Sequence, residues 1–285
     1  MIYTIIKQIR VKQWVKNLFV FIPVLVTGNI FNLELLYNSA FAFIIFSITA
    51  SSVYMMNDLK DLEKDKLHPE KSKRPLAHGD ITSNQGYLIL FLLFTLNIFL
   101  NYLFNSITLF VLFYFLLNIC YTFRLKNIPI VDLFIISFGF ILRVVSGAYS
   151  SGLDISEWLI SLTFFISLLL ILGKRYGELN NSGTDTRSIL QKYNKEFLTN
   201  SMYIVSGLII NIYLIYTTGS GNFKGNTVFI FISNIPVIYS ILKYNYLIIN
   251  NPDIIENPTK LLIKDKSIFF SVLIWALLIL TSFIL

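Results

Sequence analysis

The amino-acid sequence predicts an all-α, polytopic membrane protein with nine transmembrane helices. Of its 285 residues, 55% are hydrophobic and 14% are charged, whereas charged residues make up about 25% of a typical soluble domain. Nine apolar stretches are each long enough, with some tolerance, to cross a hydrocarbon core roughly 30 Å thick. Lysine and arginine collect in alternate loops between these stretches, which is the pattern of a membrane topology.

The apolar stretches follow one another along the whole chain. Because backbone polar groups in lipid must be satisfied within their own segment, each stretch is expected to be a helix. The first follows several cations but has no small-residue cleavage site after it, so we expect an uncleaved span. No linker or close repeat divides the chain, and residues 1–285 are expected to form one domain. The stretches cover residues 14–30, 40–56, 86–102, 107–123, 128–149, 158–172, 197–216, 228–247 and 268–285.

The positive charges predict the orientation of the chain. Of the 23 lysines and arginines, 21 lie in loops or at span ends on one side of the nine predicted spans, which should be the cytoplasmic side. The N-terminus is then cytoplasmic and the C-terminus lies outside the cell membrane. The net charge of +7 is spread over five loops without an aromatic stacking platform, so no nucleic acid partner is expected. A single cysteine, Cys120, excludes a disulfide framework.

A block of charge interrupts the apolar chain at residues 57–80, where twelve of 24 residues are charged. If the second span continues as a helix, Asp58, Asp61 and Asp65 fall within roughly 60° of one another, with Asn57 beside them. Like charges at this spacing disfavour a helix unless a cation lies between them, and Mg²⁺ binds one or two carboxylates together with phosphate oxygens. A solvated helix extension with local ion pairs accounts for the three aspartates equally well.

The residues that follow favour the metal interpretation. Lys71, Lys73 and Arg74 lie within about ten residues of the carboxylates, and Pro69 and Pro75 stiffen the loop. Carboxylates that hold Mg²⁺ beside cations that hold phosphate suit a pyrophosphate leaving group, whose developing charge must be neutralised. The block is therefore expected to bind Mg²⁺ and a diphosphate at the cytoplasmic membrane surface.

These residues resemble a known family. "NDLKDLEKD" is similar to the N-D-x-x-D-x-x-x-D motif of the UbiA superfamily of membrane-embedded prenyltransferases. Four further blocks, in order, resemble its branch of polyprenyl-phosphate phosphoribosyltransferases, known in mycobacteria as decaprenyl-phosphate phosphoribosyltransferase. They are "RVKQWVKNLFVFIPVL", "HPEKSKRP", "YTFRLKNIPIVDLFIISFGFILRVVSGA" and "LGKRYGEL". The resemblance covers nearly all of the chain and implies nine helices around a central cavity open to the cytoplasmic face.

The resemblance also implies an activity and a set of site residues. The activity is Mg²⁺-dependent transfer of a 5-phosphoribosyl group from phosphoribosyl pyrophosphate (PRPP) to a polyprenyl phosphate, with release of pyrophosphate. Asp58 and Asp61 would be catalytic and, with Asn57 and Asp65, would hold the metal. The candidates for substrate binding are Lys16, Asn17, Lys73, Arg74, Tyr121, Lys126, Arg143, Lys174, Arg175 and Glu178.

The sequence departs from the prenyltransferase pattern after the sixth span. Prenyltransferases of the superfamily usually carry a second acidic motif, D-x-x-x-D, at this place. Here stand Lys174, Arg175 and Glu178, with Asp185 further on. These cations could clamp the phosphate of a lipid monophosphate, or they could anchor a helix end at the membrane interface with a local ion pair. A phosphate monoester is already anionic at pH 7, so its attack needs no general base.

Three other candidates, Arg143, Tyr121 and Lys126, could bind substrate or could have a structural role. Arg143 lies within the fifth stretch, where facing lipid would cost at least about 2.5 kcal/mol, so it should face the protein interior. There it could bind phosphate, or it could form an interhelical ion pair or bind backbone carbonyls. Asp132 lies about 20° away around the same helix. Tyr121 and Lys126 could equally be an interfacial aromatic residue and a loop charge.

Two other functions compete with the phosphoribosyl transfer. A prenyltransferase of the same fold would move a prenyl chain from its diphosphate to an aromatic or other acceptor. The missing second motif argues against it, although Glu178 and Asp185 could partly replace that motif. A transporter would line a path through the membrane with charge, whereas here the charge lies on one face and only Arg143 lies deep.

Overall fold

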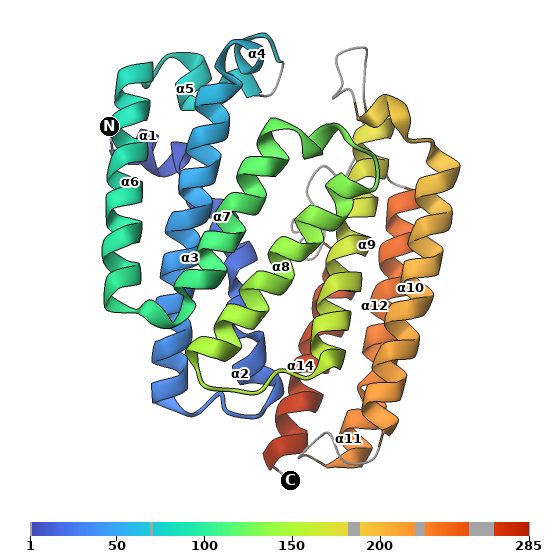
Figure 1. Cartoon of the computed structure of the whole chain (residues 1–285). Coiled ribbons are helices and arrows are strands. Elements are labelled where there is room, and N and C mark those ends of the chain that lie inside the picture. Colours follow the sequence, from blue (N-terminus) through green and yellow to red (C-terminus); the bar gives the residue numbers. More distant parts are fainter. Residues whose placement is uncertain (1, 69–70, 182–188, 220–225, 251–264, 285) are drawn as a thin grey trace. The chain divides into compact units, whose positions relative to one another are not determined.

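The computed structural model describes residues 2–68, 71–181, 189–219, 226–250 and 265–284. Every regular element in these ranges is a helix (Figure 1), so the predicted all-α class is confirmed. The elements are α1 (Ile2–Gln8), η1 (Val11–Phe21), α2 (Ile22–Val26), α3 (Leu33–Lys60), α4 (Leu62–Leu67), η2 (Lys71–Lys73), α5 (Pro75–His78), α6 (Ser83–Leu103), η3 (Asn105–Ile107), α7 (Thr108–Phe123), η4 (Leu125–Asn127), α8 (Val131–Ser150), α9 (Glu157–Asn181), η5 (Leu190–Lys192), α10 (Lys195–Thr218), α11 (Thr227–Ile232), α12 (Asn234–Asn250) and α14 (Lys266–Ile284).

Eight of these helical segments are long and apolar enough to cross a membrane, which makes the chain a multi-pass membrane protein. They are Leu33–Lys60, Ser83–Leu103, Asn105–Phe123, Val131–Ser150, Glu157–Asn180, Lys195–Thr218, Thr227–Asn250 and Lys266–Ile284. They correspond to the second to ninth predicted spans. The first predicted span, 14–30, lies mainly in the 3₁₀-helix η1 and the short α2, so a count of nine stays a prediction.

The chain divides into two compact units, and each is described by itself. Unit 1 comprises Met1–Val24, Phe31–Arg124 and Leu142–Asp154; unit 2 comprises Leu25–Ile30, Leu125–Ile141 and Ile155–Leu285. The expectation that residues 1–285 form one domain stays a prediction.

Helix α3 is the centre of unit 1 and packs against η1, α6 and α7. Its first turn is capped by Asn32, whose side-chain oxygen accepts from the backbone N–H groups of Glu34 and Leu35, and this satisfies donors that a helix start leaves free. Its buried face carries small hydroxyl residues that hold η1. Trp14 Nε1 donates to Ser51 Oγ at 3.0 Å. The 3₁₀ segment is therefore joined to α3 by side-chain hydrogen bonds as well as by apolar packing.

Helices α9, α10, α12 and α14 form the core of unit 2. Helix α9 packs on α10, α10 on α12, and α12 on α14. The apolar core between them includes Leu172, Met202, Ile209 and Ile248. Gly173 allows close packing here, because an added Cβ would lie 2.3 Å from the hydroxyl oxygen of Tyr244.

Gly147 is expected to be required for the stability of unit 1. An added Cβ at this position of α8 would lie 1.9 Å from the backbone carbonyl oxygen of Val20 in η1, and a backbone atom cannot move aside as a side chain can. We expect Gly147→Ala to lower the free energy of unfolding by at least about 1–3 kcal/mol. The measurement is thermal unfolding of the full chain in detergent.

Gly207 in α10 supplies the matched control, because an added Cβ there meets nothing within 4 Å. Gly207→Ala is expected to be neutral or to stabilise the helix by up to about 1 kcal/mol. Equal unfolding temperatures for Gly147→Ala and Gly207→Ala would contradict the packing of η1 against α8.

Candidate active site

The metal motif lies where α3 ends and α4 begins. The second span continues as a helix past Met56 to Lys60, and the backbone of Asp61, with φ −95° and ψ 13°, separates it from α4. The dense like charges of this stretch disfavour an unbroken helix. Backbone hydrogen bonds still link the two pieces, because Asp61 N–H donates to Asn57 O at 2.9 Å and Asp65 N–H donates to Asp61 O at 2.8 Å.

Asp58 lies at the centre of a cluster of charged side chains. Only 3% of the residue is exposed, and its carboxylate accepts from three side chains. Gln8 Nε2 donates to Oδ2 at 2.9 Å. Arg10 Nη2 and Arg74 Nη1 both pair with Oδ1, the latter at 3.0 Å. A buried carboxylate needs such partners, because an unpaired buried charge is costly.

Arg74 connects Asp58 to the second buried carboxylate, Asp65. The same nitrogen, Nη1, lies 2.5 Å from Asp65 Oδ2, and Lys71 Nζ lies 3.6 Å from Asp65 Oδ1. Burial lowers the pKa of Arg74 from its ordinary value and Arg10 lowers it further, while the two carboxylates oppose this shift. We call Gln8, Arg10, Asp58, Asp65, Lys71 and Arg74 the carboxylate–cation cluster.

Gln8 and Arg10 are two members of the cluster that the sequence did not single out. Gln8 is buried at the end of α1, and its Oε1 accepts from Leu76 N–H at 3.0 Å. Arg10 has a left-handed backbone (φ 56°, ψ 47°), which costs energy for a residue with a Cβ, and its guanidinium lies 4.8 Å from the ring centre of Tyr54. In the sequence, Arg10 was counted among the positive charges that indicate membrane orientation. No local sequence pattern predicts its contact with Asp58.

Asn57 is held from α7. Thr122 Oγ1 lies 2.6 Å from Asn57 Oδ1 and 2.7 Å from the carbonyl oxygen of Asn118, but a hydroxyl has a single proton to donate. The hydroxyl proton of Thr122 is therefore shared between the Asn57 side-chain oxygen and the Asn118 carbonyl oxygen. This contact fixes the orientation of the Asn57 side chain.

The cluster fits a hard divalent cation. Asp58 Oδ1 and Asp65 Oδ2 converge on one cationic nitrogen of Arg74, and Mg²⁺ prefers one or two carboxylates together with phosphate oxygens and water. Across the ranges that the structure describes, no three His, Cys, Asp or Glu side chains gather as a metal group. The structure therefore brings together two carboxylates, with Asp61 half-buried at the helix break.

Arg143 and Asn17 form a second polar group in unit 1. The buried Arg143 donates from Nε to Asn17 Oδ1 at 2.6 Å and from Nη2 to Tyr114 Oη at 2.9 Å. Asn17 Nδ2 in turn donates to Ser47 Oγ at 3.0 Å. Arg143 thus faces the protein interior, as predicted. Lys16 lies half-buried in η1.

Arg175 lies in a buried network in unit 2. Its Nη2 lies 2.9 Å from Asp132 Oδ2, and its Nη1 donates to Glu178 Oε2 at 2.6 Å. Tyr193 Oη donates to Asp132 Oδ1 at 2.6 Å, and burial, followed by this hydrogen bond, raises the pKa of Tyr193. Lys174 Nζ lies 3.6 Å from Glu178 Oε1. The local ion pair predicted for Arg175 and Glu178 is present, and Asp132 is a partner that the sequence did not identify.

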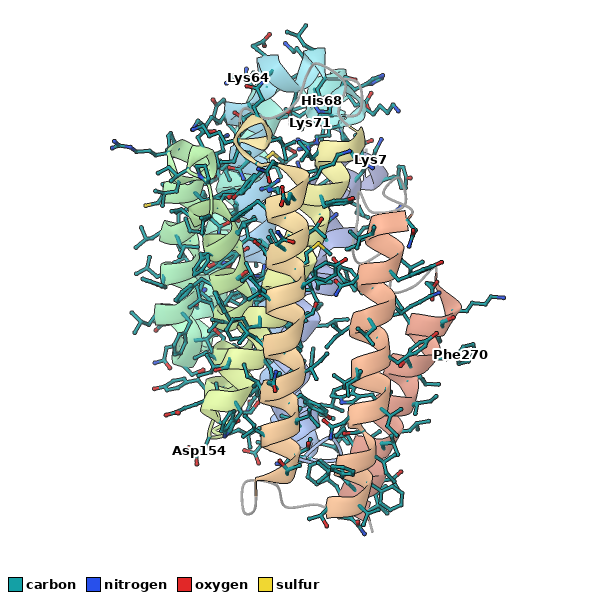
Figure 2. The ribbon with its side chains drawn as sticks, turned by 90° about the vertical axis from the view of Figure 1, so that its right-hand side faces the viewer. Lys7, Lys64, His68, Lys71, Asp154 and Phe270 are labelled. Atoms are coloured by element: carbon teal, nitrogen blue, oxygen red, sulfur yellow. The ribbon has the colours of Figure 1, made fainter. Side chains whose placement is uncertain are left out.

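The remaining candidates lie around these groups. Lys73 is exposed in η2, and its carbonyl oxygen accepts from Lys7 Nζ at 3.2 Å. Tyr121 is half-buried in the last turn of α7 and Lys126 is half-buried in η4. Asp185 lies outside the described residues. Figure 2 shows Lys64, His68 and Lys71 at one end of unit 1 and Asp154 at the other, so the charged block occupies one end of that unit.

Comparison with known proteins identifies the family. Residues 18–254 match the UbiA prenyltransferase family. The chain belongs to this family. The UbiA fold is also apparent in a UbiA homologue from Archaeoglobus fulgidus solved with GPP and Mg²⁺, which superposes with a TM-score of 0.71 over 98% of each chain at 17% identity.

Two relatives of this chain are named decaprenyl-phosphate phosphoribosyltransferase. The protein from Corynebacterium glutamicum is 34% identical over 201 residues, which cover 68% of this chain and 60% of the relative. The protein from Mycobacterium tuberculosis is 26% identical over 279 residues, covering 95% of this chain and 91% of the relative. The match thus spans less than two thirds of the first relative and nearly all of the second.

Proposed function

We propose that this UbiA-family protein transfers a 5-phosphoribosyl group from PRPP to a polyprenyl phosphate and releases pyrophosphate. The observation that carries the proposal is the convergence of Asp58 and Asp65 on one cationic position beside Arg10, Arg74 and Lys71. Such a group can hold a metal ion and the oxygens of a diphosphate together. The choice of donor and acceptor is supported by the names of the two relatives that cover this chain.

In this proposal the metal motif holds Mg²⁺ with the donor pyrophosphate. Asn57, Asp58, Asp61 and Asp65 would bind the ion, with Asp58 and Asp61 the catalytic pair. When bound, Mg²⁺ would neutralise charge that develops on the departing pyrophosphate. Arg74 and Lys73 would bind phosphate oxygens, Arg74 through its planar fork and Lys73 as a point charge.

The other candidate residues would bind substrate phosphate groups. In unit 1 these are Lys16 and Arg143, with Asn17 and Tyr121, and in unit 2 they are Lys126 and Lys174. Arg175 is engaged by two carboxylates, so we assign it to positioning Glu178, which in turn holds Lys174. An acceptor phosphate oxygen forms a bond to the anomeric carbon as the bond from that carbon to the pyrophosphate oxygen breaks. The acceptor is already an anion, so no residue needs to remove a proton.

We further propose that the protein lies in the cell membrane with a cytoplasmic N-terminus, an external C-terminus and a central cavity open to the cytoplasm. The gathering of Lys64, Lys71 and the metal motif at one end of unit 1 supports this orientation, because cations favour the cytoplasmic side. A reporter fused to the C-terminus should be accessible from outside intact cells. A reporter protected inside the cell would contradict the orientation.

A direct assay tests the proposed function. Purified full-length protein is incubated with Mg²⁺, labelled PRPP and a polyprenyl phosphate, and the organic phase is scored for label. We expect labelled lipid with Mg²⁺ and a loss of labelled lipid when a chelator removes the metal. Absence of labelled lipid, together with transfer from a labelled prenyl diphosphate to an aromatic acid, would favour the prenyltransferase alternative. Absence of both reactions would leave transport as the remaining candidate.

Thr122 is expected to support metal binding through Asn57. Thr122→Val keeps the shape of the side chain but removes the hydroxyl that orients the Asn57 amide. Loss of such an outer partner typically lowers metal affinity or activity by about 10–100-fold, so the Mg²⁺ concentration for half-maximal transfer should rise. Thr122→Ser retains the hydroxyl and is the matched control. An unchanged Mg²⁺ dependence in Thr122→Val would remove Asn57 from the metal site or Thr122 from its support.

A further inference from the structure

We propose that Arg10 and Arg74 couple binding of the divalent cation to binding of the diphosphate. The two guanidinium groups hold the carboxylates while no diphosphate is bound, and they transfer to the diphosphate when the cation takes their place. This inference rests on the proposed function. It assigns a substrate-binding role to Arg10, which lies before the first predicted span and outside the metal motif.

The two arginines compete with a cation for the same atoms. Arg10 Nη2 and Arg74 Nη1 both contact Asp58 Oδ1, and Arg74 Nη1 also contacts Asp65 Oδ2. A cation that binds these two oxygens must displace Arg74 from both and weaken the contact of Arg10. Occupation of the carboxylates by the arginines therefore opposes binding of the cation alone.

Charge repulsion acts in the same direction. The carboxylates of Asp58 and Asp65 are paired with three positive groups, those of Arg10, Lys71 and Arg74. A divalent cation arriving alone would bring two further positive charges beside displaced guanidinium groups. A diphosphate removes this repulsion, because its oxygens accept the planar forks of both arginines in paired hydrogen bonds.

The exposure of the side chains places the arginines on the accessible side of the cluster. The side chains of Arg10 and Arg74 are 24% and 30% exposed, whereas those of Asp58 and Asp65 are each 4% exposed. A ligand arriving from solvent therefore reaches the guanidinium groups before the carboxylates. Gln8 is bonded to the other oxygen of Asp58, Oδ2, so it can keep this carboxylate oriented while its Oδ1 partners are exchanged.

The test measures metal binding without turnover. Full-length protein in detergent is titrated with Mn²⁺ as a spectroscopic substitute for Mg²⁺, with and without saturating PRPP and without acceptor. Protein-bound Mn²⁺ is read by electron paramagnetic resonance and corrected for the complex of Mn²⁺ with free PRPP. Since coupling between ligands typically amounts to about 5–150-fold, we expect PRPP to tighten Mn²⁺ binding by at least about tenfold.

Variants of the two arginines separate coupling from simple loss of a ligand. In Arg10→Gln and in Arg74→Gln, Mn²⁺ alone should bind more tightly than to the unmodified protein, and the effect of PRPP should fall by several-fold. If the substituted arginine merely stabilised the fold, its loss would instead weaken Mn²⁺ binding both without and with PRPP. The two variants are prepared separately, so that poor folding of one leaves the other as the test. Lys64→Gln is the matched control, because Lys64 is an exposed cation of α4, and it should leave the coupling unchanged.

The outcomes distinguish this inference from the proposed function. Equal Mn²⁺ affinity with and without PRPP, in a protein that still transfers phosphoribosyl groups, would overturn the coupling and leave the function intact. Weaker binding of Mn²⁺ alone to both arginine variants would also overturn it. Failure to bind Mn²⁺ even with PRPP, together with absence of transfer, would overturn the proposed function itself.

Discussion

Asp58→Asn is expected to lower the rate of phosphoribosyl transfer by about 10²–10³-fold, the usual cost of removing one preorganised electrostatic group. The amide keeps the shape of the carboxylate and an oxygen that can accept from Gln8 or from an arginine. It removes the negative charge that the proposed metal requires. The measurement is the single-turnover rate of label transfer from PRPP to the lipid at saturating Mg²⁺.

The asparagine substitution is more informative than alanine at this position. Asp58→Ala would leave the donors of Gln8, Arg10 and Arg74 facing a buried gap, so a loss of activity could reflect a damaged fold. Glu63→Gln is the matched control, because Glu63 is an exposed carboxylate of the same charged block, and it should retain full activity. Normal transfer by Asp58→Asn would contradict the metal assignment.

Asp132→Ala is expected to cause the largest loss of stability, about 3–5 kcal/mol, because it breaks a buried ion pair. Arg175 would keep only Glu178 as a carboxylate partner, and the hydroxyl of Tyr193 would lose its acceptor. Asp132 is fully buried and accepts from both Arg175 and Tyr193. The measurement is thermal or denaturant unfolding of the full chain in detergent. Asp154→Ala, at an exposed aspartate, should change stability by less than about 0.5 kcal/mol.

A double variant tests the physical cause of that loss. Asp132→Leu combined with Arg175→Met replaces the ion pair with apolar side chains, and such replacements are often neutral or stabilising. The double variant should therefore be more stable than Asp132→Ala. If it is equally unstable, the buried charge of Arg175 is not the origin of the effect.

The transmembrane helices were predictable because lipid leaves the backbone few alternatives. The second to ninth predicted spans all correspond to helices of the structure. Their ends were less predictable, since they depend on single capping contacts. Helix α3 begins at Leu33, well before residue 40, because the Asn32 side chain caps it. The break at Asp61 lies within a stretch whose spacing also suited a continuous helix.

The carboxylate–cation cluster could be predicted in part where its residues are close in sequence. Spacing grouped Asp58, Asp61 and Asp65 with the cations that follow them, and in the structure Arg74 joins Asp58 to Asp65. The partners from distant segments could not be found in this way. Arg10 reaches Asp58 from 48 residues away, and Asp132 reaches Arg175 from 43 residues away. Such contacts follow from helix packing, for which one sequence carries no local signal.

The 3₁₀ geometry of η1 determines whether the first predicted span is long enough to cross the bilayer. A 3₁₀-helix rises about 2.0 Å per residue and an α-helix about 1.5 Å. The eleven residues of η1 and the five of α2 therefore extend over roughly 30 Å, about the thickness of the hydrocarbon core. The same residues wound entirely as an α-helix would extend over about 24 Å, which is about 6 Å less than that thickness. If this segment crosses the membrane as predicted, the number of crossings is odd, and we expect the N- and C-terminal helices to end on opposite sides of the bilayer.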